Sequence, residues 1–215
     1  MHQINTLIWD WNGTLLDDTD ICIETINVLL TERNIPNIDR QQYLTVFGFP
    51  VKDYYQRIGF DFENEPFEIP AHRYIEIYSS KLEQCQLHNG VLEVLNIFKQ
   101  RGLTQLILSA SEQQLLEHSL QLFGIEKWFA SVAGLNNHFA QSKTEIGKRM
   151  LNDMGISPSE ACLIGDTTHD FDVAATMGCQ CILIANGHQT AEKLEETGAL
   201  VLPDMKELPK VFRAK

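Results

Sequence analysis

Asp10, Ser109 and Asp166 each follow a short apolar run, directly or after one glycine. Runs of this length and composition are typical of buried parallel strands. Because ligands of an open parallel sheet bind beyond the carboxyl ends of its strands, we expect these three side chains to converge on one crevice. There a carboxylate could act as a nucleophile or bind a cation, although an aspartate at a strand end can also simply cap the next turn.

Asp166 and Asp170 are four residues apart, a spacing that places two side chains on one face of a helix. Asp170 could also stabilise a helix N-terminus electrostatically. Of these two interpretations we favour a role in ligand binding.

Helical patterns separate the apolar runs, and each pattern stops at a glycine, the residue that commonly follows a helix C-terminus. Alternation of strands and helices implies right-handed crossovers and an open parallel sheet with helices on both faces. We therefore predict an α/β fold with a Rossmann-like core. The four patterns cover residues 91–101, 113–123, 143–154 and 171–177.

The segment of residues 17–84 interrupts this alternation, because its patterns are helical throughout. We expect a core of residues 1–16 and 85–215, with residues 17–84 inserted as a helical cap that covers the crevice like a lid. Asp17, Asp18 and Asp20 would cap and polarise the first helix of the cap. The four helical patterns of the cap cover residues 21–30, 41–47, 51–58 and 69–82.

Composition indicates a folded protein that avoids polyanions. The hydrophobic fraction of 44% is near the globular average, so a chain of 215 residues can bury a proper core. A net charge of −12 argues against nucleic acid and membrane as partners, and an anionic substrate would need a local cation. The sequence lacks a signal-peptide pattern and a membrane-length apolar stretch. We expect a cytoplasmic monomer or weak homodimer whose cysteines are mostly buried free thiols.

The stretch from Asp10 to Asp17, DWNGTLLD, is similar to the first motif of the haloacid dehalogenase superfamily. The resemblance continues in the order of the family through residues 107–111 (ILSAS), Lys143 and residues 165–170 (GDTTHD). It spans essentially the whole chain. Four ordered motifs favour an active-site origin for Asp10 over the turn-capping interpretation. Residues 89–93 and 174–178 resemble the phosphoglycolate phosphatase branch.

The resemblance implies a hydrolase that acts on a small phosphate monoester, a phosphorylated metabolite. Asp10 would be the nucleophile and would form an aspartyl-phosphate that water hydrolyses. Ser109 and the backbone amide of Ala110 would bind phosphate oxygens. Lys143 would neutralise charge on Asp10 and on the phosphoryl group.

The resemblance also implies Mg²⁺ as the cofactor. Its ligands would be the carboxylates of Asp10 and Asp166 and the backbone carbonyl of Asn12, with Asp170 as a direct or water-mediated ligand. A hard octahedral ion held by few carboxylates and several waters suits this set.

Asn12 departs from the family pattern, which usually has a second aspartate two residues after the nucleophile, as general acid and base. An amide neither gives nor takes a proton at neutral pH, and loss of such a group costs about 10²–10⁴ in rate. Three explanations stay open. The protein could be a slow phosphatase that uses good leaving groups or another proton donor such as His169. It could be a catalytically weak or inactive phosphometabolite-binding or regulatory protein. An aspartate could also have been replaced deliberately to trap a complex.

Other chemistries of the superfamily fit this sequence less well. Dehalogenases dispense with magnesium, whereas this chain retains the acidic loop of residues 165–170. Carbon–phosphorus hydrolases use a lysine of the cap, for which Lys52 is available. Lys52 lies in residues 47–52 (FGFPVK), which resemble the specificity loop of the family, and it is a candidate substrate contact. A solvated surface lysine is an equally good interpretation.

Overall fold

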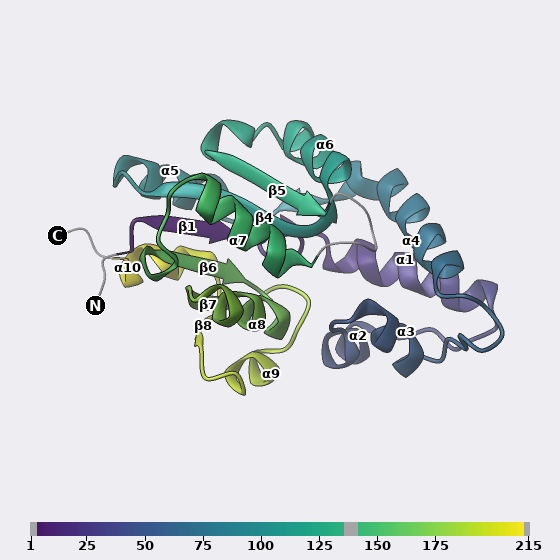
Figure 1. Cartoon of the computed structure of the whole chain (residues 1–215). Helices are drawn as coiled ribbons and strands as arrows, with labels where there is room; N and C mark the ends of the chain where they lie inside the picture. The colour runs from purple at the N-terminus through teal and green to yellow at the C-terminus, as the bar shows by residue number, and fades with distance from the viewer. Residues whose placement is uncertain (1–3, 136–141, 213–215) are drawn as a thin grey trace.

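A computed structural model describes residues 4–135 and 142–212. Within these residues six strands form one parallel sheet in the order β5-β4-β1-β6-β7-β8 (Figure 1). The central strands β1 and β6 are buried on both faces, as their unbroken apolar sequences require. The strands are β1 (Thr6–Trp9), β4 (Thr104–Glu112), β5 (Ser131–Leu135), β6 (Ala161–Gly165), β7 (Gln180–Ile184) and β8 (Leu200–Leu202).

Helices cover both faces of the sheet, which confirms the predicted α/β class. Successive residues of a strand point to opposite faces, so Leu7 and Trp9 belong to one hydrophobic cluster and Ile8 to the other. The cluster around Ile8 is closed by side chains of α7 (Lys143–Asp153) and α8 (Thr168–Met177). The opposite cluster is closed by helices that include α5 (Val91–Gln100), α6 (Gln113–Phe123) and α10 (Leu208–Val211). A short helix, α9 (Ala191–Glu195), precedes β8.

Two predicted boundaries in the core were wrong. Strand β4 continues past Ser109 to Glu112, with a register shift after Leu108, so Ser109 lies within the strand and not after it. Helix α8 begins at Thr168 and not at Phe171, because Thr167 and Asp170 form a capping box that extends the helix by one turn.

The helices inserted after the first strand lie beyond the arrowheads of the parallel strands (Figure 1). A two-stranded antiparallel ribbon of β2 (Leu16–Asp17) and β3 (Gln86–Leu87) joins them to the sheet, and we place the boundary between core and cap at this ribbon. The helices α1 and α4 pack against each other. The bounds are α1 (Thr19–Glu32), α2 (Arg40–Val46), α3 (Val51–Arg57) and α4 (Glu68–Lys81), each within two residues of its predicted pattern.

Two further predictions concern membranes and cysteines. Across the described part of the chain, every helix is too short or too polar to cross a membrane. The cysteines are free thiols, of which three are buried and two, Cys179 and Cys181, are half-buried.

Candidate active site

Lys143 joins two carboxylates that are far apart in the sequence. Its Nζ lies 2.6 Å from Oδ1 of Asp10 and 2.6 Å from Oδ1 of Asp170, and all three side chains are buried. Asp10 immediately follows β1, where its backbone N–H still donates to Ile164 of β6. Lys143 is the first residue of α7, a helix that begins at this place because the side chain of Ser142 caps it. The sheet and two helix N-termini therefore build one ion-paired centre.

Asp170 serves both as a helix cap and as a member of this centre. Its Oδ2 accepts hydrogen bonds from the backbone N–H and the hydroxyl of Thr167 and from the backbone N–H of Asp166, while Oδ1 faces Lys143. Asp166 precedes the helix, so the two aspartates do not share a helix face. The tight turn between β6 and α8 brings them together instead.

Asp166 is held by hydrogen bonds from two other loops. Its Oδ1 accepts from the hydroxyl of Thr14 at 2.8 Å, and its Oδ2 accepts from the backbone N–H of His188 at 2.6 Å. Gly13, at φ +73°, packs so closely that a Cβ there would lie 2.3 Å from Oδ2 of Asp166. The DWNGT motif thus needs glycine at this position to admit the carboxylate.

Three buried carboxylates meet in this centre, and their electrostatics favour a bound cation. Oxygen atoms of Asp10, Asp166 and Asp170 lie within 4.8 Å of one another. Burial raises the pKa of Asp10 to about 8, with repulsion from Asp170 and Asp166 adding to the effect and Lys143 opposing it. Burial likewise raises the pKa of Asp166 to about 6. A divalent ion that prefers oxygen ligands would relieve this excess of negative charge, so the residues fit such an ion.

The side chain of Asn12 has hydrogen-bond partners that suit an amide. Its Nδ2 donates to Oδ2 of Asp18 at 2.7 Å and to the hydroxyl of Tyr78 at 2.8 Å, and its Oδ1 accepts from the hydroxyl of Ser111 at 2.7 Å. Tyr78 in turn donates to Asp18 at 2.7 Å. Both N–H donors and the oxygen acceptor of the Asn12 amide are therefore hydrogen-bonded. A carboxylate has no N–H donor and could not make the same three hydrogen bonds.

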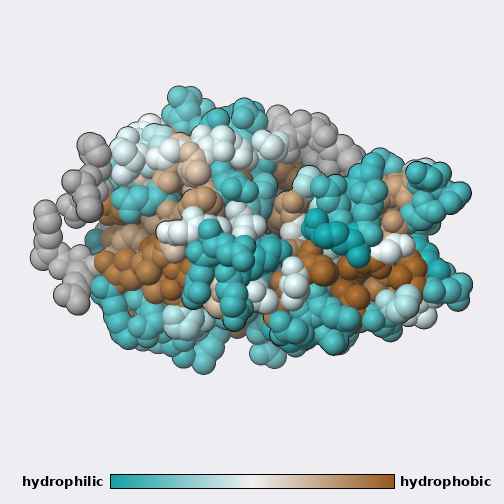
Figure 2. All heavy atoms as spheres, turned by 90° about the horizontal axis from the view of Figure 1, so that it is seen from below, coloured by the Kyte–Doolittle hydropathy of each residue, from teal (hydrophilic) through white to brown (hydrophobic). Residues whose placement is uncertain are grey.

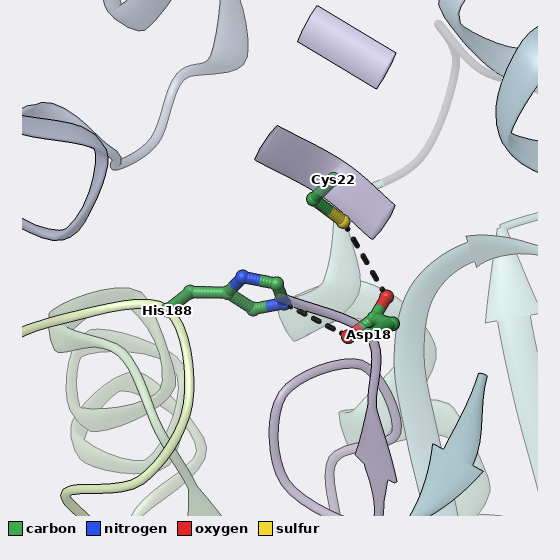
Figure 3. Close-up of side chains that lie close together, drawn as sticks. All are labelled: Asp18, Cys22 and His188. Carbon is green, nitrogen blue, oxygen red and sulfur yellow. Dashed lines mark hydrogen bonds and ion pairs between the residues drawn. The ribbon is translucent and has the colours of Figure 1, made fainter. Parts of the chain in front are cut away.

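Asp18 does not cap helix α1 with its side chain, contrary to the sequence expectation. Its carboxylate lies 3.2 Å from Nε2 of His188, a core residue from the loop after β7 (Figure 3). The other ring nitrogen, Nδ1, is 3.0 Å from the hydroxyl of Tyr43 in the cap. Burial would lower the pKa of His188, but attraction and hydrogen bonding to Asp18, together with attraction to other carboxylates, raise it to about 9. His188 is therefore a buried cation that links core and cap.

The same ion pair opposes metal binding at Asp18, Cys22 and His188, which lie close enough to share an ion (Figure 3). Burial raises the pKa of the Cys22 thiol well above its ordinary value, so the thiolate is disfavoured. Both carboxylate oxygens of Asp18 are already hydrogen-bonded. These residues form a neutral ion-paired cluster.

A cavity of about 740 Å³ opens over this centre, between the core and the cap. Asp10, Ser109, Ala110 and Lys143 line one side of it, so these sequence-predicted residues do come together. Aromatic side chains of the cap line the other side. Figure 2 shows hydrophobic residues at the surface both at the cap end of the molecule, on the right, and at the opposite end, on the left, each area bordered by hydrophilic residues.

Lys52 and Phe49 lie on the cap side of this cavity. Lys52 is exposed, and its Nζ lies 5.7 Å from the centre of the Phe62 ring. Phe49 stacks on the ring of His169 from the core, with ring centres 4.4 Å apart. On the sequence alone His169 was a possible proton donor, and no local pattern indicates that it stacks on Phe49.

Asp18, Tyr78, Ser111 and His188 were not selected as site residues from the sequence. Ser111 lies within the second motif, so its position could have been noticed. Asp18 resembled an ordinary helix cap, and Tyr78 and His188 carry no local signal that tells them from other residues of their type.

The chain belongs to the haloacid dehalogenase-like hydrolases, because the model of this family matches residues 7–184. Similar proteins include the phosphoglycolate phosphatase of Caulobacter vibrioides, which is 25% identical over 222 residues and covers 98% of this chain and 92% of that protein. The probable phosphatase IndB of Dickeya dadantii is 24% identical over 203 residues, covering 92% and 88%.

The fold is shared with solved structures at lower identity. A haloacid dehalogenase-like hydrolase of Streptococcus pneumoniae superposes with a TM-score of 0.84 at 19% identity and covers 98% of this chain and 99% of its own. The chain therefore has the same overall fold as this hydrolase.

Proposed function

We propose that this protein is a magnesium-dependent phosphatase that hydrolyses a small phosphate monoester through an aspartyl-phosphate on Asp10. The observation that carries the proposal is the contact of Lys143 with both Asp10 and Asp170 beside the third carboxylate, Asp166. Relatives named as phosphatases support the reaction class.

Asp10, Lys143, Ser109 and the amide of Ala110 would each have a separate role in this reaction. Asp10 has one oxygen, Oδ1, on Lys143, and its Oδ2 accepts no hydrogen bond from a described residue, so an oxygen remains to attack phosphorus. Lys143 would hold the carboxylate in place and neutralise charge on the phosphoryl oxygens. Ser109 and the backbone amide of Ala110 line the same cavity and would bind those oxygens.

Mg²⁺ would be held by Asp10 and Asp166, with the Asn12 carbonyl and Asp170 completing the protein ligands. When bound, the ion would neutralise charge that develops on the transferring phosphoryl group. Lys143 occupies Oδ1 of Asp170 and Thr167 occupies Oδ2, which favours a water-mediated role for Asp170.

The test is phosphate release from a panel of small phosphate esters with Mg²⁺, comparing the natural sequence with Asp10→Asn and with Asn12→Asp. We expect slow, magnesium-dependent turnover that Asp10→Asn abolishes and Asn12→Asp changes. Activity that persists in a folded Asp10→Asn protein would refute the nucleophile assignment. If none of the three proteins released phosphate from any ester, the phosphatase proposal would be refuted.

A catalytically weak phosphometabolite-binding protein is the second candidate, favoured by the hydrogen bonds that hold Asn12 as an amide. Both candidates predict that phosphate and Mg²⁺ bind in the same cavity. Brisk turnover by the natural sequence excludes the second candidate. Tight phosphate-ester binding without turnover supports it.

A further inference from the structure

The cap side of the cavity is aromatic and still partly accessible. Phe49, Phe67 and Tyr74 line it and are half-buried, so each keeps some exposed surface. Tyr54 lines it as well, with a buried hydroxyl that has no hydrogen-bond partner among the described residues. The volume of about 740 Å³ lies within the usual range for small-molecule sites, roughly 300–1,000 Å³. These walls suit a flat ring that carries a polar group.

The charges around the cavity do not suit a second anionic group on the substrate. Of the two lysines among its described lining residues, Lys143 is already bound by two carboxylates. The other, Lys52, is exposed and lies above the ring of Phe62. Glu112 and Asp172 add negative charge to the lining. His188 also lines the cavity, but its charge is paired with Asp18. A carboxylate on the substrate would therefore find no unpaired buried cation among the described lining residues, whereas an uncharged body needs none.

The leaving group must depart without a proton from residue 12. Asn12 cannot act as an acid, and its amide is held by Asp18, Tyr78 and Ser111. A phenol has a pKa of about 10, as the tyrosine side chain does. An aliphatic alcohol is close to water, at about 15.7. A phenolate is therefore the far better unprotonated leaving group.

Building on the phosphatase function proposed above, we infer that the substrate is a small aryl phosphate, the phosphate monoester of a phenol. The Asp10 carboxylate forms a bond to phosphorus while the bond from phosphorus to the phenolic oxygen breaks, and that oxygen leaves with the electron pair. The phenolate takes a proton from solvent. Water then attacks phosphorus and gives its proton to solvent. The bond from phosphorus to the Asp10 oxygen breaks with its electron pair on that oxygen, so inorganic phosphate leaves and Asp10 returns as a free carboxylate.

The first experiment measures kcat/KM with Mg²⁺ for phenyl phosphate, ring-substituted phenyl phosphates, glycerol 2-phosphate and phosphoglycolate. We expect phenyl phosphate to exceed both aliphatic esters by at least 10²-fold. We also expect kcat/KM to rise steeply as the pKa of the leaving phenol falls, and this dependence to become shallower in Asn12→Asp.

A second measurement tests recognition apart from chemistry. Calorimetry with Mg²⁺ compares benzylphosphonate, which cannot be hydrolysed, with 2-carboxyethylphosphonate. We expect the aryl compound to bind at least tenfold more tightly. Phe49→Leu should reduce the ratio of the two affinities, whereas Phe212→Leu, which changes a ring packed on Phe98 away from the cavity, should leave it unchanged.

The outcomes separate the two proposals. Turnover in which aliphatic and aryl esters react equally well, or equal binding of the two phosphonates, overturns the aryl assignment and leaves the phosphatase standing. Preferential binding of benzylphosphonate without hydrolysis of any ester supports the aryl site and overturns the phosphatase.

Discussion

The side-chain amide of Asn12 donates a 2.7 Å hydrogen bond to Oδ2 of Asp18, a carboxylate six residues further along the chain. Asp18 stays ionised because attraction and hydrogen bonding to His188, together with bonds from Tyr78 and Asn12, outweigh burial and lower its pKa to about 2. An aspartate at position 12 would face this charge directly. The identity of residue 12 is thus coupled to its neighbours and not only to catalysis.

Exchanging the residue types at positions 12 and 18 should reveal this coupling. Asn12→Asp alone should destabilise the fold by about 1–3 kcal/mol, because it places two buried carboxyl groups together. Asn12→Asp combined with Asp18→Asn restores one amide and one carboxyl group, so the double variant should be more stable than the sum of the single changes predicts. Urea unfolding of all four proteins measures the coupling. Additive single effects would contradict it.

The ion pair of Asp18 and His188 should make stability depend on pH. The pKa of His188 is raised from 6.5 to about 9 in the folded protein, so its contribution is complete below pH 6.5 and disappears as the pH rises through 9. The loss is up to about 3 kcal/mol, at about 1.4 kcal/mol per pKa unit. Urea unfolding between pH 6 and pH 10 should show this decline in the natural sequence and a shallower one in His188→Gln. If the stability of both proteins declined with pH in parallel, the contribution of His188 would be ruled out.

Removal of the cation between Asp10 and Asp170 should damage both activity and stability. Lys143→Met leaves two buried carboxylates without their shared partner, and breaking such a pair costs about 3–5 kcal/mol. Turnover should fall by at least about 10²-fold. Lys148→Met, an exposed lysine on the same helix, is the matched control. If both variants behaved alike, Lys143 would have no special role.

Mg²⁺ should stabilise the folded protein, since an ion bound only by the native state raises the melting temperature. Asp166→Asn should remove most of this shift. Asp172→Asn is the matched control, because Asp172 lines the cavity but is exposed and lies outside the carboxylate cluster. Thermal unfolding at increasing Mg²⁺ measures the shift without any substrate. An undiminished shift in Asp166→Asn would remove that residue from the metal site.

Local pattern was sufficient to predict a parallel sheet, three of its strands and most of its helices. Asp10 and Ser109 do meet at the cavity, whereas Asp166 meets Asp10 in the buried carboxylate cluster and does not line the cavity. A strand buried on both faces needs an unbroken apolar run, and a glycine commonly follows the C-terminus of a helix. Both features can therefore be recognised from consecutive residues. The edge strands β5 and β8 were not predicted. They are short and only partly buried, so their sequences carry a weaker signal.

Tertiary structure alone decided the surroundings of Asn12 and His188. The amide of Asn12 meets Tyr78 and Ser111, which are 66 and 99 residues away, and His188 meets Tyr43 at a separation of 145 residues. Side chains so distant in sequence meet only when the sheet and the cap have both formed. Such a contact leaves no periodic pattern in the sequence, because each of these polar residues could equally lie on a solvent-exposed surface. The sequence by itself indicated where the candidate site lies, and packing between core and cap decided which groups hold Asn12 and how the cavity over the site is shaped.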